Sequence, residues 1–203
     1  MSTQRASRSG IQAQKLVYFA VFTALVIVLQ CLASFVFPKI GLSLNLSLIP
    51  IVLGAALCNK WSGAWLGFVS SFIILFDPTT VGFMTFNAPA TIFLVLLKGT
   101  AAGLAAGLIY SLLEKKNRYV ALTVAAALAP IVNTGLFFGG CFTFFAPYIE
   151  EVQSFLISSG EKVPDNIVAF VIIVFIGINF LIEFAVNLLF VPVISRLIKI
   201  KAR

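Results

Sequence analysis

The sequence predicts an all-α membrane protein with six transmembrane helices and both termini in the cytoplasm. Of the 203 residues, 61% are hydrophobic and 10% are charged. Soluble domains carry about 25% charged residues, so a soluble fold of this composition would leave large apolar surfaces in water. The apolar residues also gather into long runs, and the basic residues between the runs fall on one side of a membrane if the helices alternate in direction.

The apolar runs define the domain organisation. Residues 1–14 form a polar N-terminal segment, which we expect in the cytoplasm, and residues 15–200 form one transmembrane domain of six helices. A spanning helix needs about 20 mainly apolar residues. The second run is short and contains Pro50, so we expect it to be bent or to begin in a loop. The six runs cover residues 15–37, 46–57, 62–76, 88–113, 119–145 and 166–198.

The charge distribution predicts the orientation. The basic residues of the termini and of the second and fourth connections share one side, which the positive-inside rule makes cytoplasmic. We attribute the net charge of +7 to this topology and to anionic lipid, and we expect no nucleic-acid partner. The connections 38–45, 77–87 and 146–165 then lie outside, where long loops suit a binding site that opens outward. The basic residues on the cytoplasmic side are Arg5, Arg8, Lys15, Lys60, Lys115, Lys116, Arg118, Arg196, Lys199, Lys201 and Arg203.

Small residues recur four positions apart in three of the runs. Such spacing opens a groove along a helix, where a second helix can approach closely in lipid. For the pairs in the third and fourth runs we expect packing inside the monomer. For Ala20 and Ala24 in the first run, internal packing and contact with another protein are equally compatible with the sequence. The pairs in the later runs are Gly63 with Gly67, and Gly99, Gly103 and Gly107.

Two charges, Lys98 and Glu183, lie deep inside apolar runs. Charges in a bilayer are costly, and they usually face a partner or a cavity. A structural ion pair between the two and a role in a ligand pocket are both open, and they are compatible. Asn179, Glu183 and Asn187 recur every fourth residue, which places them on one stripe of a helix. We favour a cavity lining for this stripe, with hydrogen bonds between helices as the alternative.

Other polar groups complete the set of candidate substrate-binding residues. Asn133 lies within the fifth run beside Thr134, and Gln30 lies in the first. Asn45 and Asn87 stand where the second and fourth runs begin. For Asn87, helix capping is the preferred alternative because Ala88 and Pro89 follow it. The candidate substrate-binding residues are therefore Lys98, Asn133, Asn179, Glu183, Asn45 and Asn87.

No pattern in the sequence predicts catalysis, a metal or a cofactor. The chain has no histidine, and its three cysteines lie in or beside apolar runs without the spacing of a metal site. It has no phosphate-binding loop. We therefore predict no catalytic residues, no metal site and no cofactor.

At this point the sequence resembles a known family, the substrate-binding S components of the energy-coupling factor (ECF) transporters, which import vitamins into bacteria. The resemblance spans nearly the whole chain. It rests on the small size, the six runs, the predicted cytoplasmic termini and four motifs. These are Ala20-Val21-Phe22-Thr23-Ala24, Leu46 to Gly54, Gly63 to Phe68, and Lys98 to Leu104.

The resemblance implies a mechanism. An S component of the bacterial plasma membrane captures a vitamin or precursor near the outer face, and outer loops close over it. It then topples as it joins a transmembrane coupling protein and two ATPase subunits. In the family the alanine motif of the first helix meets the coupling protein, so Ala20 and Ala24 would be the docking residues here. No motif indicates riboflavin, thiamine or biotin, and the lack of histidine disfavours nickel or cobalt.

For the capture of a vitamin, Lys98 would offer a cationic donor to a carboxylate or phosphate, which gives a preference for an anionic ligand such as pantothenate.

Two further hypotheses come from other classes of protein. The same pair, Lys98 and Glu183, could instead act as acid and base of an intramembrane enzyme on a lipid-like substrate. A stand-alone secondary transporter is less natural, because the six runs show no evident inverted repeat.

Overall fold

Helices account for every regular element in the part of the chain that the structure describes. The computed structural model describes residues 2–36 and 45–201, with the side chains of 13–36, 45–177 and 179–196. Residues 37–44, most of the predicted first outer connection, lie outside this part, as do the side chains of Arg5, Arg8 and the last three basic residues. The elements are α1 (Ser2–Cys31), the π-helical turn η1 (Leu32–Val36), α2 (Leu48–Leu57), α3 (Lys60–Ile74), α4 (Pro78–Leu113), α5 (Arg118–Phe144), α6 (Ala146–Ser158), α7 (Ile167–Phe170), the π-helical turn η3 (Val171–Ile176) and α8 (Gly177–Lys201).

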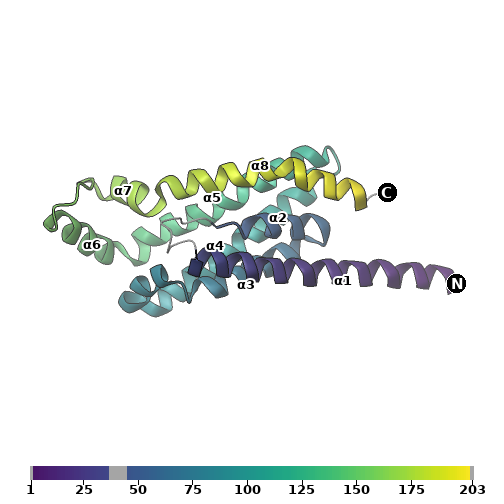
Figure 1. The fold of residues 1–203 in the computed structure, drawn as a ribbon, viewed down its shortest axis with the longest axis horizontal. Helices are drawn as coiled ribbons and strands as arrows, with labels where there is room; N and C mark the ends of the chain where they lie inside the picture. Colours follow the sequence, from purple (N-terminus) through teal and green to yellow (C-terminus); the bar gives the residue numbers. More distant parts are fainter. Residues whose placement is uncertain (1, 37–44, 202–203) are drawn as a thin grey trace.

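The helices run back and forth along one direction of an elongated molecule (Figure 1). The start of α1, the turn from α4 to α5 and the end of α8 lie at one end. The helices α6 and α7 lie at the other end. The two described ends of the chain therefore share one end of the molecule, and the acidic segment from Glu150 to Asp165 lies at the opposite one.

Four helical stretches are long and apolar enough to cross a membrane. They are Ala13–Val36, Pro78–Leu113, Arg118–Phe144 and Asn179–Arg196. The predicted class of an all-α, multi-pass membrane protein is thereby confirmed. The apolar helices Leu48–Leu57 and Ile167–Ile176 are shorter, and α3 has only 15 residues. Among the described residues, four of the six predicted spans are therefore long and apolar enough for a full crossing.

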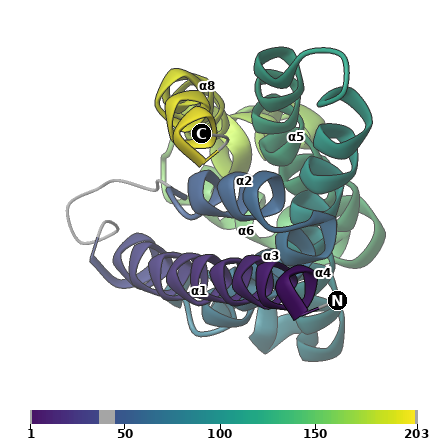
Figure 2. The same ribbon diagram turned by 90° about the vertical axis from the view of Figure 1, so that its right-hand side faces the viewer.

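The short helix α2 forms the centre of the bundle. Eight of its ten residues are buried. Residues 45–47 before it are not helical, so the second run begins in a loop, which is one of the two expected alternatives. It contacts α1, α3, α4, α5 and α8, and the end-on view shows it between α1 and α8 (Figure 2). Its apolar side chains join Val26 of α1, Leu66 of α3 and Leu122 of α5 in one core. A second core of Phe145, Ile149 and Phe170 lies where the end of α5, α6 and α7 meet.

Glycines bring α3 and α4 into backbone contact. A Cβ added at Gly63 would meet the carbonyl oxygen of Gly103, and one at Gly67 would meet that of Gly99. Any side chain here would separate the helices. The expected packing of these small residues inside the monomer is confirmed, and we call these four glycines the glycine interface.

Two predicted loops were wrong, because each contains a helix. Residues 78–86 are helical because the side chain of Asp77 accepts a hydrogen bond from the N–H of Thr79 (2.9 Å), with Pro78 in the first turn. In the second case, α6 buries Ile149 and Gln153 and exposes Glu150 and Glu151. An amphipathic helix of this kind lacks the continuous apolar run by which the longer helices were recognised.

Candidate functional site

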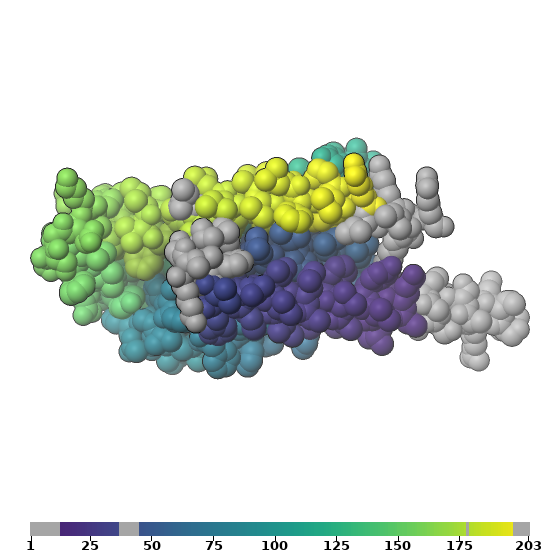
Figure 3. Space-filling model, in the orientation of Figure 1, coloured from purple at the N-terminus to yellow at the C-terminus, as the bar shows by residue number. Residues whose placement is uncertain are grey.

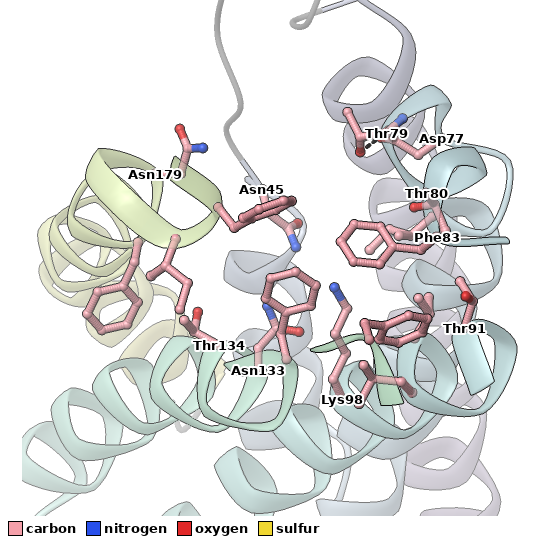
Figure 4. A pocket seen from close by; sticks show the side chains of 18 of the residues that line it. Asn45, Asp77, Thr79, Thr80, Phe83, Thr91, Lys98, Asn133, Thr134 and Asn179 are labelled. Carbon is pink, nitrogen blue, oxygen red and sulfur yellow. Dashed lines mark hydrogen bonds between the residues drawn. The ribbon is translucent and has the colours of Figure 1, made fainter. Parts of the chain in front are cut away.

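A cavity of about 470 Å³ lies between the helices, in the half of the molecule that carries α6 and η3. Its size is in the range of small-molecule sites. Five of the six predicted substrate-binding residues line it, namely Asn45, Lys98, Asn133, Asn179 and Glu183. They come from the segment before α2 and from α4, α5 and α8, so the fold brings together side chains that are far apart in the sequence (Figure 4).

Aromatic rings form one side of the cavity. Phe83 of α4 is at their centre, and its ring makes edge-on contacts with four others. The centroid distances are 5.9 Å to Phe137, 5.1 Å to Phe145, 5.1 Å to Tyr148 and 5.8 Å to Phe175. We call these five rings the aromatic wall. It joins α4, α5, α6 and η3, and it offers edges and faces to an apolar ligand group.

Lys98 reaches the cavity from the middle of α4 (Figure 4). Its ammonium nitrogen lies 4.9 Å from the centroid of the Phe137 ring, in a cation–π contact. No carboxylate among the described residues lies within ion-pair distance of it, although Glu183 lines the same cavity. The two intramembrane charges therefore form no direct ion pair, and both face the cavity.

Glu183 connects α8 to the segment that precedes α2. Its Oε1 accepts a hydrogen bond from the backbone N–H of Asn45, at 3.2 Å. Asn187, one turn further along, is buried, and its amide donates to the carbonyl oxygen of Glu183 at 2.8 Å. The predicted polar stripe of the last helix thus divides. Asn179 and Glu183 line the cavity, and Asn187 makes a hydrogen bond within its own helix.

Several polar side chains of the lining have no hydrogen-bond partner among the described residues. Asn133, Thr134 and Asn179 are in this group. The contrast within α5 is direct, because Thr123 and Thr143 each donate to the carbonyl four residues earlier, at 2.9 and 2.8 Å. The hydroxyl of Thr134 is left available to a molecule in the cavity.

Asn87 is absent from the cavity lining. Its backbone is non-helical (φ −151°, ψ 86°), and its side chain accepts a hydrogen bond from the N–H of Ala90 at 3.2 Å. It ends the helical stretch 78–86 and caps the longer stretch that begins at Ala88. The capping alternative considered for Asn87 is thus what the structure shows.

A buried polar network that includes the cavity-lining residues Gln30 and Asn45 was missed from the sequence. Oε1 of Gln30 accepts hydrogen bonds from the hydroxyls of Ser47 (2.9 Å) and Ser70 (2.7 Å), and its amide donates to Ser34 at 3.1 Å. The hydroxyl of Ser47 also lies 2.6 Å from Oδ1 of Asn45. This network holds Asn45 in place. Gln30 gave a sequence signal, but serines within apolar runs are too common to single out.

The residues at the mouth of the cavity were also missed. Asp77, Thr79 and Thr80 line it, and the oxygen Oδ1 of Asp77 accepts from the hydroxyl of Thr79 at 2.7 Å. They fall in the stretch that was expected to be a loop. The turn signal Asp77-Pro78 marked the place without indicating that a helix begins there.

The alanine pair of α1 lies on the outside of the molecule. Ala20 and Ala24 are exposed, whereas Phe22, Val26 and Gln30 on the opposite side of the helix are buried. In the space-filling view, α1 forms a surface ridge along the bundle (Figure 3). Internal packing therefore does not account for the pair.

An all-helical membrane bundle with a polar, ligand-sized cavity defines a membrane protein that binds a small molecule. The family described as ECF transporter, substrate-specific component, matches residues 14–195. The chain belongs to this family, and it is a substrate-binding transporter subunit of the S-component type. Members of the family bind a small-molecule substrate and associate with the ECF coupling and ATPase module, and the family is one of transporter subunits rather than enzymes. Comparisons with curated proteins and with solved structures gave no match.

Proposed function

We propose that the cavity captures a vitamin or a related micronutrient outside a bacterial cell for uptake. The observation that carries this proposal is the group of polar side chains that have no hydrogen-bond partner among the described residues, namely Asn133, Thr134 and Asn179, beside Lys98 in a cavity of about 470 Å³. Polar groups inside a membrane protein usually face a cavity or a partner, and a bound ligand would supply partners for these. Capture needs no chemistry, so we assign no catalytic role to Lys98 or Glu183.

We further propose six crossings with cytoplasmic termini. The short helices α2 and α3 run in opposite directions and complete the alternation of the four longer helices (Figure 1). The basic residues Lys115, Lys116 and Arg118 lie at the turn from α4 to α5, and the carboxylates of α6 lie at the other end. With the positive-inside rule, the cavity then opens toward the outside.

We propose that Ala20 and Ala24 dock onto the transmembrane coupling protein, which two ATPase subunits energise. Their exposure on α1 supports this. Small residues let two helices approach closely in lipid, and the opposite side of α1 is occupied by the core of this chain.

A binding screen of the purified protein tests the capture of a micronutrient. The protein in nanodiscs is titrated with a panel of vitamins and their precursors by isothermal titration calorimetry. We expect saturable binding of one compound at a ratio of one to one. If no member of the panel binds, the proposed function is wrong.

A further inference from the structure

The cavity is lined by Lys98 and Glu183, two opposite charges that do not pair with each other. From this arrangement we infer that its occupant is a dipolar molecule of zero net charge with an aromatic body. Its acidic group meets Lys98, and its N–H or ammonium group meets Glu183. The inference rests on the proposed function, because it names the class of substrate that the cavity takes.

The surroundings of Lys98 require an anion. Its ammonium nitrogen lies 4.9 Å from the centroid of the Phe137 ring, and no carboxylate of the described residues lies within ion-pair distance of it. A cation–π contact is weak beside the cost of removing an ammonium from water, so a ligand that displaces the water of the cavity must bring an anionic partner for Lys98. A ligand carboxylate or similar acid beside the Phe137 ring would complete this site.

The surroundings of Glu183 require a donor. One carboxylate oxygen accepts a single backbone hydrogen bond from Asn45, at 3.2 Å, and no other donor among the described residues reaches the side chain. One neutral hydrogen bond does not replace the hydration of a carboxylate. An ammonium or N–H group of the ligand is the chemical complement of the free oxygen.

The charge balance excludes a ligand with only one kind of charge. The third charged group of the lining, Asp77, already has partners, because its Oδ1 accepts from the N–H and the hydroxyl of Thr79 at the start of α4. A helix N-terminus also stabilises a carboxylate. Asp77 keeps its charge at the start of α4, and the two remaining charges, Lys98 and Glu183, sum to zero. An anion alone would leave Glu183 with only the backbone N–H of Asn45, and a cation alone would leave Lys98 with only the Phe137 ring.

This conclusion revises the preference for an anionic ligand that Lys98 suggested from the sequence.

The aromatic wall supports the second part of the inference, namely that the ligand has an aromatic body. Its five rings form one continuous side of the cavity, and aromatic groups pack well on such edges and faces. Thr134 and Asn133 provide hydrogen bonds for the remaining polar edge of the ligand.

Three indoles with matched bodies test the charge pattern. L-tryptophan carries both charges, indole-3-propionate carries only the acid, and tryptamine carries only the ammonium. They are titrated into the full-length protein in nanodiscs, together with riboflavin, thiamine, biotin and pantothenate. We expect the tightest ligand of the whole panel to be aromatic, dipolar and of zero net charge. L-tryptophan should bind roughly tenfold or more tightly than either of the other indoles, since each charge-assisted hydrogen bond contributes on that scale.

Charge variants give the second readout. Lys98→Gln and Glu183→Gln should each weaken the tightest ligand roughly tenfold to hundredfold. Glu183→Gln should also reduce the difference in affinity between L-tryptophan and indole-3-propionate. Lys98→Gln should reduce the difference in affinity between L-tryptophan and tryptamine. Lys116→Gln and Glu151→Gln, exposed residues outside the cavity, are the matched controls and should leave affinity unchanged.

The outcomes separate the two proposals. Tightest binding of pantothenate, biotin, thiamine or a singly charged indole, or an affinity that either cavity variant leaves unchanged, would overturn the inference and leave the proposed function standing. The same holds for tight binding of riboflavin without any effect of Lys98→Gln. If no compound of the panel binds, both the inference and the proposed function are wrong.

Discussion

The glycine interface of α3 and α4 and the alanine pair of α1 have the same four-residue spacing but opposite surroundings. At Gly63, Gly67 and Gly103 an added Cβ would first meet the backbone of the facing helix, and at Gly99 it would meet the Ser71 hydroxyl and then the carbonyl of Gly67. At Ala20 and Ala24 the side chains are exposed, and the core lies on the other side of the helix. The spacing alone therefore indicates close helix contact somewhere, and only the fold distinguishes contact within the chain from contact available to a second protein.

The sharpest test of this comparison is a large side chain at the glycine interface. In Gly67→Leu the new side chain would overlap the backbone of Gly99. Because both residues lie within helices, α3 and α4 would have to separate to make room for it. We expect loss of most of the folded protein, measured by size-exclusion chromatography in detergent. Gly139→Leu is the matched control, since nothing lies within 4 Å of a Cβ there. A well-folded Gly67→Leu protein would show that the interface tolerates separation.

A large side chain on the alanine pair should have a different effect. Ala24→Trp projects into open space, so the fold and the cavity should be retained. We expect the coupling protein and ATPases to co-purify at less than about a tenth of the wild-type yield, because the indole prevents close helix contact. Ala185→Trp, at an exposed alanine of α8, should co-purify normally. Equal loss of ligand binding in Ala24→Trp would mean that the pair supports the fold instead.

Adding a single methyl group should destabilise the protein more at the glycine interface than at a glycine elsewhere in the bundle. Gly103→Ala places a Cβ against the carbonyl of Gly63, and we expect it to lower the free energy of unfolding by about 1–3 kcal/mol. Gly135→Ala, where a Cβ meets nothing within 4 Å, should change it by less than about 0.5 kcal/mol. Thermal unfolding of the two variants in the same detergent measures the difference. Similar melting temperatures would contradict the tight packing of α3 on α4.

The smallest effect is expected when the alanine pair stays small. In Ala24→Ser the side chain keeps nearly the same volume, so assembly with the coupling protein should be retained. Stability should change by less than about 0.5 kcal/mol, because the position is exposed. Co-purification and thermal unfolding are measured for Ala24→Ser and Ala24→Trp together. The comparison distinguishes the effect of side-chain size from the effect of replacing the alanine at all. Loss of assembly in Ala24→Ser would show that size does not govern docking.

The sequence predicted those features that depend on local chemistry. Apolar runs revealed the long helices, and the spacing of Gly63 and Gly67 revealed the contact between α3 and α4. Polar residues such as Lys98 and Glu183 were recognised because charges inside a membrane stand out, and the fold brings both to one cavity. Each of these features could be predicted because the pattern that reveals it lies within one residue or a few neighbouring residues in the sequence.

The missed features depend on contacts between distant parts of the chain. The serines that bond to Gln30 are ordinary residues until α1, α2 and α3 meet. The side of α1 that remains exposed is decided by where α2 packs. The helix α6 was missed for a different reason, because its buried residues Ile149 and Gln153 are too few to form an apolar run.

The hydrogen bond from Asn45 to Glu183 has a consequence for biogenesis. It joins residues 138 positions apart, so a chain emerging from the ribosome lacks the partner of Asn45 until the last helix is made. The cavity walls likewise extend from Gln30 to Glu183. Binding competence therefore arises late, after α8 enters the membrane, and a substrate can stabilise only chains that have completed insertion.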